Sequence, residues 1–215
     1  MTSEQIAGEP LAAAPGSASS WNIANALTVT RLLIVPWFGW SLLAGDGRGT
    51  GQRVTAFGLF ALASYTDRLD GQLARRHDLV TAFGKLADPI ADKALTGTAL
   101  IGLSLLSELP WTVTVVVLVR EVGVTLLRFW VIRHGVIAAS RGGKLKTLLQ
   151  GLAIGLYVLP LTGPLASGRA VVMAVAVALT VATGVDYVVR AVTLRRTSPR
   201  AAMKRARRAA GHRST

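Results

Sequence analysis

Long apolar stretches recur along this chain of 215 residues and constrain its fold more than any other feature. A helix needs about 20 mostly apolar residues to cross the roughly 30 Å hydrocarbon core of a membrane. Six stretches have that length, approximately residues 25–44, 54–76, 83–106, 111–133, 146–165 and 170–190. The sequence therefore predicts an all-α, polytopic membrane bundle of six transmembrane helices.

The charge composition also favours a membrane protein. Only 16% of the residues are charged, whereas ordinary soluble proteins contain about 25%. A net charge of +13 is typical of nucleic-acid binders, but here the basic residues lie mostly between or after the apolar stretches, so no nucleic-acid partner is expected. The chain has no cysteine, which excludes disulfides, thiolate metal ligands and a cysteine nucleophile.

The distribution of lysine and arginine predicts the orientation of the bundle, because cytoplasmic loops carry the excess of positive charge. The first, third and fifth loops contain only Arg48, Arg53 and Arg169. Both termini and the active site are therefore expected on the cytoplasmic side of the cell's inner (plasma) membrane. We expect residues 1–20 to be a disordered leader, residues 21–190 the membrane domain and residues 191–215 a basic cytoplasmic tail that meets anionic lipid.

Of the eleven acidic residues, four fall in the second and third predicted spans: Asp67 and Asp70 in the second, and Asp88 and Asp92 in the third. Ionisable residues in a span cost several kcal/mol each and are retained mainly for function. A short connection makes these two helices antiparallel neighbours, so the four carboxylates can meet. Their mutual repulsion then requires compensation. A bound divalent cation would provide it. Because the chain offers carboxylate oxygens and no cysteine thiolate as ligands, Mg²⁺, Mn²⁺ or Ca²⁺ is the expected ion.

Small residues accompany the carboxylates of the second span. Gly71 and Ala74 share a helix face with Asp67, Asp70 and Arg75. Small side chains often serve only to let membrane helices pack closely. Because acidic residues and an arginine flank them here, we favour a ligand seated between the carboxylates.

These residues follow a spacing that specifies eight positions: Asp67, Asp70, Gly71, Ala74, Arg75, Gly84, Asp88 and Asp92. The pattern resembles the signature of the CDP-alcohol phosphatidyltransferases, and the likeness extends over about residues 22–187. Segments 22–31, 83–93, 120–128 and 142–150 are most similar to the actinobacterial phosphatidylglycerophosphate synthases of that family. The resemblance implies transfer of a phosphatidyl group from CDP-diacylglycerol to sn-glycerol 3-phosphate with release of CMP, in phospholipid biosynthesis, by a homodimer.

The resemblance also implies roles for individual residues. Two divalent cations, Mg²⁺ or Mn²⁺, would be bound, one by Asp67, Asp70 and Asp88 and the other by Asp67, Asp88 and Asp92, with Asp92 also the catalytic general base. The residues implied to bind the CDP-lipid are Asn25, Thr28, Gly71, Ala74, Arg75 and Thr81. The candidates for binding the acceptor's phosphate, which needs cationic partners, are Arg120, Arg128, Lys144 and Lys146.

Several alternatives remain open at this point. Arg120 could form a structural pair with Glu121, and Lys144 and Lys146 could merely mark the topology. The acceptor could be phosphatidylglycerol, as in a cardiolipin synthase, or inositol phosphate, although the cationic residues favour a phosphorylated acceptor. An intramembrane prenyltransferase or a cation transporter would also place carboxylates within a membrane.

Overall fold

A computed structural model describes residues 23–76, 82–131 and 141–197. In this part of the chain the backbone forms six α-helices and one short 3-10 helix, and the all-α prediction is confirmed. The elements are α1 (Ile23–Leu43), η1 (Ala44–Gly47), α2 (Thr50–Arg76), α3 (Ala82–Leu105), α4 (Trp111–Val131), α5 (Arg141–Val158) and α6 (Pro164–Thr197). The expected leader, Thr81 and residues 198–215 of the expected tail lie outside the described residues.

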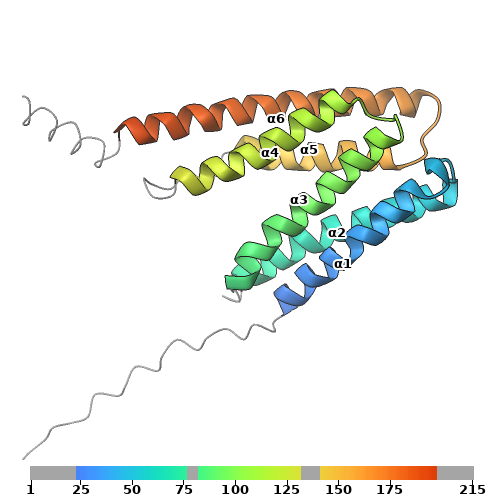
Figure 1. The fold of residues 1–215 in the computed structure, drawn as a ribbon, viewed down its shortest axis with the longest axis horizontal. Helices are drawn as coiled ribbons and strands as arrows, with labels where there is room; N and C mark the ends of the chain where they lie inside the picture. Colours follow the sequence, from blue (N-terminus) through green and yellow to red (C-terminus); the bar gives the residue numbers. More distant parts are fainter. Residues whose placement is uncertain (1–22, 77–81, 132–140, 198–215) are drawn as a thin grey trace, which may run out of the picture.

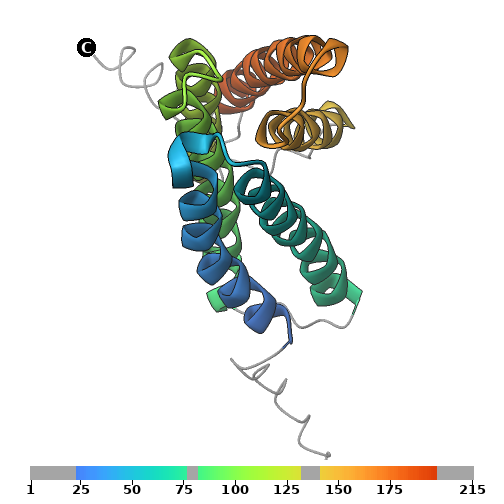
Figure 2. The ribbon, with the colours of Figure 1, turned by 90° about the vertical axis from the view of Figure 1, so that its right-hand side faces the viewer.

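The helices form two groups that join along α3 and α5 (Figure 1). In the first group α1 packs against α2 and α3, and in the second α6 packs against α4 and α5. Contacts of α3 with α4 and α5, and of α2 with α5, connect the groups. Figure 2 shows α5 and α6 on one side of the α1–α3 pair. The helices that carry the acidic signature, α2 and α3, therefore lie between α1 and the second group.

The turn between α5 and α6 lies earlier than the sequence predicts. The fifth stretch was expected to run to residue 165, but α5 ends at Val158 and α6 begins at Pro164. Pro160 disfavours a helical conformation in the residue before it. Gly163 adopts a φ of +64°, which glycine tolerates without strain, and proline suits the first turn of a helix. At its other end α6 continues past residue 190 to residue 197, because no glycine or proline interrupts it there.

The bundle buries polar side chains and exposes apolar ones. Arg31 and Arg53 are almost completely buried, whereas Trp37 and Trp40 of α1 and Leu165 of α6 are about two-thirds exposed, at 65, 67 and 68%. A soluble domain shows few large exposed apolar patches, but a helix bundle in lipid turns its apolar side chains outward and its ionisable residues inward. This distribution supports a membrane-embedded bundle.

Two segments of the described chain, Asn25–Gly47 and Pro164–Leu194, are long and apolar enough to cross a membrane by length and composition. The helices between them include the acidic and basic residues of the site, which lower their apolar character. The signature residues of α2 and α3 thus lie, in the sequence, between the two segments that meet this criterion.

Two glycines allow α1 and α3 to approach closely. A Cβ atom at Gly39 would lie 2.9 Å from Thr98 Cγ2, and one at Gly102 would lie 2.7 Å from Leu42 Cδ2. Both distances are shorter than normal carbon–carbon contacts, so larger residues would force the helices apart. This packing fixes α1 against the helix that carries Asp88 and Asp92.

An ion-pair network joins four segments at the end of α2 that is distant from the acidic signature. Arg53 Nε donates to the carbonyl of Val158 at 2.9 Å, and its Nη2 donates to the carbonyl of Tyr157 at 2.7 Å. The same Nη2 lies 3.1 Å from Glu108 Oε1, and Glu108 Oε2 pairs with Arg169 Nη2 at 2.8 Å. Arg53 thereby satisfies carbonyls that the end of α5 leaves without helical partners.

Candidate active site

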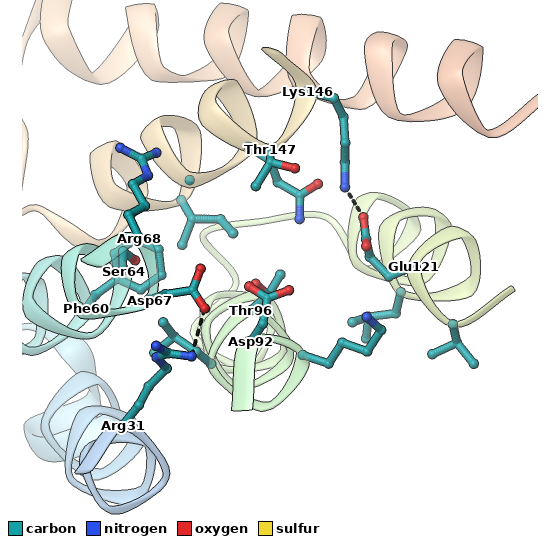
Figure 3. Close-up of a pocket in the computed structure, with 17 residues that line it drawn as sticks. Arg31, Phe60, Ser64, Asp67, Arg68, Asp92, Thr96, Glu121, Lys146 and Thr147 are labelled. Atoms are coloured by element: carbon teal, nitrogen blue, oxygen red, sulfur yellow. Dashed lines mark hydrogen bonds and ion pairs between the residues drawn. The ribbon is translucent and has the colours of Figure 1, made fainter. Parts of the chain in front are cut away.

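A cavity of about 170 Å³ lies among α1, α2, α3, α4 and α5 (Figure 3). Its charged lining residues are Arg31, Asp67, Arg68, Asp92, Lys93, Glu121 and Lys146. Its apolar lining includes Phe60, Leu95, Leu118, Val122 and Ile154. Five helices thus contribute to one space in which both acidic and basic groups meet within an otherwise apolar bundle.

On one side of the cavity, Asp67 of α2 pairs with Arg31 of α1. Arg31 Nη1 lies 2.7 Å from Asp67 Oδ1. The arginine side chain is completely buried, while 39% of the Asp67 side chain is exposed. Figure 3 shows the carboxylate between the guanidinium and the cavity. The ion pair therefore leaves Asp67 accessible to a ligand.

Asp88 and Asp92 lie one helical turn apart on α3. Asp92 lines the cavity, where the charges of Asp67, Glu121 and Lys146 act on its carboxylate. Thr28 of α1, almost completely buried, donates a hydrogen bond from Oγ1 to Asp88 Oδ1. The resemblance implies that Thr28 contacts the CDP-lipid. In this structure its hydroxyl instead donates to Asp88, one of the signature carboxylates.

Asn25, the other α1 residue implied to bind the CDP-lipid, is 5% exposed. It lies one turn before Thr28 on the same helix face. The structure therefore places both residues on the side of α1 that is turned toward the bundle.

Across the cavity, Lys146 of α5 forms an ion pair with Glu121 of α4, through Nζ and Oε1 (Figure 3). Lys146 is 4% exposed and Glu121 is 17% exposed. Because an unpaired charge is costly in such a setting, each residue stabilises the other. Lys146 is the member of the predicted acceptor-phosphate set that lines this cavity among the described side chains.

Arg120 is directed to α6 instead. Its Nε donates to the carbonyl of Thr180 at 3.1 Å, and its Nη2 donates to Thr183 Oγ1 at 2.8 Å. Its Nη1 lies 3.5 Å from Glu121 Oε1. A Cβ atom at Gly184 would lie only 3.0 Å from Arg120 Cγ, so the glycine makes room for the arginine. These contacts favour the structural alternative for Arg120.

The remaining predicted site residues are only partly described. The backbone of α2 includes Asp70, Gly71, Ala74 and Arg75, that of α4 includes Arg128 and that of α5 includes Lys144, but their side chains lie outside the described structure. Thr81 lies outside it altogether. On α2, Asp70 and Ala74 follow Asp67 at three and seven positions, so these residues share a face of the helix.

Hard oxygen donors are the groups that this site offers to a metal. Asp67 and Asp92 face the same cavity, and Asp88 lies one turn from Asp92. The described side chains form no group of three or more carboxylates or imidazoles that is complete by itself, and Asp70, the fourth carboxylate, is not among them. Carboxylates of this kind fit Mg²⁺ or Mn²⁺.

The sequence alone suggests no role for Arg31 and suggests Glu121 only as a possible partner of Arg120. The sequence nevertheless marks Arg31 as unusual, because it is the only charged residue in the apolar stretch 25–44. A lone arginine in a membrane helix normally turns inward to a carboxylate. The sequence alone does not show which carboxylate it meets.

Comparison with known proteins is consistent with this site. The sequence profile of the family described as CDP-alcohol phosphatidyltransferase matches residues 21–182. A probable phosphatidylglycerophosphate synthase of Mycobacterium tuberculosis (strain ATCC 25618 / H37Rv) is 58% identical over 176 residues, covering 82% of this chain and 84% of that protein.

Two further relatives are more distant. A CDP-diacylglycerol–glycerol-3-phosphate 3-phosphatidyltransferase of Rickettsia typhi is 36% identical over 77% of this chain and 94% of its own. A cardiolipin synthase (CMP-forming) of Streptomyces coelicolor is also 36% identical, but over only 53% of each chain. The family match and the relative that is 58% identical establish that this chain belongs to the CDP-alcohol phosphatidyltransferase family.

Proposed function

We propose that this chain transfers the phosphatidyl group of CDP-diacylglycerol to sn-glycerol 3-phosphate, giving phosphatidylglycerophosphate and CMP. Family membership removes the prenyltransferase and the cation transporter as alternatives and leaves the acceptor alcohol as the question. The observation that carries the proposal is one cavity with Asp67 and Asp92 on one side and Lys146 on the other. The likeness to a probable phosphatidylglycerophosphate synthase and to a CDP-diacylglycerol–glycerol-3-phosphate 3-phosphatidyltransferase supports the same acceptor.

In the proposed reaction the 1-hydroxyl oxygen of glycerol 3-phosphate attacks the phosphorus that bears the diacylglycerol. The new oxygen–phosphorus bond forms as the bond to the CMP oxygen breaks, and CMP leaves with the bonding electron pair. Asp92 accepts the proton of the attacking hydroxyl as general base. Its accessibility from the cavity suits that role, because the carboxylate can reach an acceptor held there.

We assign Asp67, Asp70 and Asp88 to one divalent cation and Asp67, Asp88 and Asp92 to a second. Bound cations would reduce the repulsion between two anionic substrates and stabilise the leaving phosphate. The chain's own contribution is to hold the carboxylates in place, through Arg31 for Asp67 and through Thr28 for Asp88.

Binding of the CDP-lipid is assigned to Asn25, Thr28, Gly71, Ala74, Arg75 and Thr81 by resemblance. Gly71 and Ala74 follow Asp67 by one and two turns of α2, and Arg75 follows it by about two turns on the same helix. An arginine suits the diphosphate because its guanidinium can bind two oxygens at once. Thr28 has the weaker claim to a nucleotide contact, since its hydroxyl already donates to Asp88.

The acceptor's phosphate is assigned to Lys146, with Lys144 and Arg128 as further candidates. Lys146 lines the cavity, so its ammonium, paired with Glu121 in this structure, is placed to bind a phosphate oxygen there. Arg120 contributes indirectly, because it holds Glu121 and joins α4 to α6. Phosphatidylglycerol carries no phosphomonoester and would leave such a pocket unused.

We further propose that all six helices cross the inner (plasma) membrane with the termini and the cavity on the cytoplasmic side. The lysine and arginine distribution of the sequence supports this orientation. A disordered leader over residues 1–20, a membrane domain over residues 21–190, a basic cytoplasmic tail over residues 191–215 and a homodimer complete the proposal.

The acceptor is tested by measuring CMP release from CDP-diacylglycerol with Mg²⁺ present and one acceptor at a time. The acceptors are glycerol 3-phosphate, phosphatidylglycerol and inositol phosphate, and Asp92→Asn protein supplies the background rate. We expect release with glycerol 3-phosphate alone. Release with phosphatidylglycerol and none with glycerol 3-phosphate would identify a cardiolipin synthase instead.

A further inference from the structure

Two side chains of α1 reach signature carboxylates on two different helices. Thr28 and Arg31 are three residues apart and therefore share a helix face. Thr28 donates to Asp88 on α3, and Arg31 pairs with Asp67 on α2. One face of α1 thus sets the relative position of two carboxylates that lie 21 residues apart in the sequence.

Arg31 is completely buried, although arginine is among the residues that proteins bury least. Its Nη1 lies 2.7 Å from Asp67 Oδ1, and the Asp67 side chain, which is 39% exposed, lines the cavity. Figure 3 shows the Asp67 carboxylate paired with this guanidinium at the side of the cavity. This arrangement suits a fixed counter-charge better than a substrate ligand.

The acidic signature needs such a counter-charge when no metal is bound. Asp67, Asp70, Asp88 and Asp92 lie on two adjacent helices in an apolar bundle, where repulsion between carboxylates is weakly screened. A divalent cation relieves the repulsion only while it is bound. A guanidinium held inside the bundle relieves part of it at all times.

We propose that Arg31 is a positioning residue that acts as a resident cation of the acidic cluster: it keeps the carboxylates of α2 and α3 together in the metal-free enzyme, beside the site where a divalent cation binds. This inference rests on the proposed function, because it takes Asp67 and its neighbours as metal ligands. In this proposal, a residue of α1 stabilises a metal site whose ligands belong to α2 and α3.

The test is thermal unfolding of the full-length protein in detergent, with EDTA and then with saturating Mn²⁺. Arg31→Gln should lower Tm in EDTA, and Mn²⁺ should recover most of that loss, because the added cation replaces the missing charge. The rise in Tm on adding Mn²⁺ is thus larger in Arg31→Gln than in the wild type. An equal or smaller rise contradicts the proposal.

The control is Arg53→Gln, which removes a second buried arginine whose carboxylate partner, Glu108, lies outside the cavity lining. Arg53→Gln should lose the same amount of Tm with and without Mn²⁺. If the wild type shows no response to Mn²⁺, the metal site of the proposed function is refuted. If the wild type responds and Arg31→Gln responds no more strongly, only the role of Arg31 is refuted.

A double variant keeps the question answerable if Arg31→Gln does not fold. Asp67→Asn removes the negative charge that Arg31 balances, so Arg31→Gln/Asp67→Asn should be more stable in EDTA than Arg31→Gln alone. Coupling of this sign between neighbouring residues is what a double-mutant cycle measures. A double variant that is no more stable than Arg31→Gln shows that Arg31 serves packing rather than charge.

Discussion

Replacing Lys146 by methionine separates its two roles, acceptor binding and charge pairing. The lysine is 4% exposed and pairs with Glu121 on the cavity wall. Methionine retains an unbranched apolar side chain of similar length and removes the ammonium. The packing of α5 against its neighbours is therefore largely kept, and the changes that follow are due to charge.

The effect on acceptor binding can be estimated from the interaction that is lost. A hydrogen bond between a charged donor and a phosphate contributes about 2–3 kcal/mol, which is roughly 30- to 150-fold at 1.36 kcal/mol per decade. We expect KM for glycerol 3-phosphate to rise by that factor, with KM for CDP-diacylglycerol unchanged. Initial rates of CMP release, with each substrate varied in turn, measure both constants.

Stability should also fall, because Glu121 loses its lysine. Removing one partner of a buried pair costs about 3–5 kcal/mol, and we expect the lower value, about 3, because Arg120 Nη1 still lies 3.5 Å from Glu121. The double variant Lys146→Met/Glu121→Gln should regain stability without regaining acceptor affinity. An unchanged acceptor KM in Lys146→Met, or recovery of both properties in the double variant, would refute the assignment.

Three further substitutions test other parts of the site. Asp92→Asn should lower kcat by about 10²–10⁴-fold, the usual contribution of a general base, while binding of CDP-diacylglycerol measured at equilibrium persists; wild-type turnover would exclude Asp92 as the base. Thr28→Val should lower kcat with an unchanged KM for CDP-diacylglycerol, because it frees Asp88, and Thr28→Ser should retain activity; a raised KM for the lipid would instead place Thr28 on the nucleotide. Gly184→Val should destabilise the protein by about 1–3 kcal/mol, as overpacking does, since its side chain would collide with Arg120; an unchanged Tm would contradict that contact.

Local spacing explains how much of the site could be predicted from the sequence. Asp88 and Asp92 lie one helical turn apart, and α2 and α3 contact each other, although each packs mainly against α1. The spacing depends only on helical geometry. The same geometry predicted six helices, with errors only at helix ends such as that near Pro160.

The contacts between distant segments could not be predicted in this way. Arg31 and Asp67 are 36 positions apart, and Thr28 and Asp88 are 60 apart. The cost of an isolated charge in a membrane requires each ion to find a partner, but it does not choose the partner. Arg120 is an example: its guanidinium donates hydrogen bonds to α6, whereas the neighbouring Glu121 lines the cavity. The sequence does not distinguish these two directions.

The charge balance of the cavity has a consequence for the order of binding. Its described lining carries three carboxylates, from Asp67, Asp92 and Glu121, and four cationic side chains, from Arg31, Arg68, Lys93 and Lys146. With Asp70 and Asp88, the two further carboxylates of the proposed metal site, these side chains carry five negative and four positive charges, a net charge of −1.

One divalent cation changes the net charge of this site to +1, but a second alone would leave it at +3 in an apolar bundle, where excess charge is costly. The diphosphate of the CDP-lipid brings the negative charge that a second cation requires. From this charge balance, we expect the purified enzyme to bind about one Mn²⁺ ion per chain in the absence of lipid. With CDP-diacylglycerol bound, we expect about two. Electron paramagnetic resonance of free Mn²⁺ measures both values. Two equivalents bound in the absence of lipid would show that the basic residues do not limit the metal site.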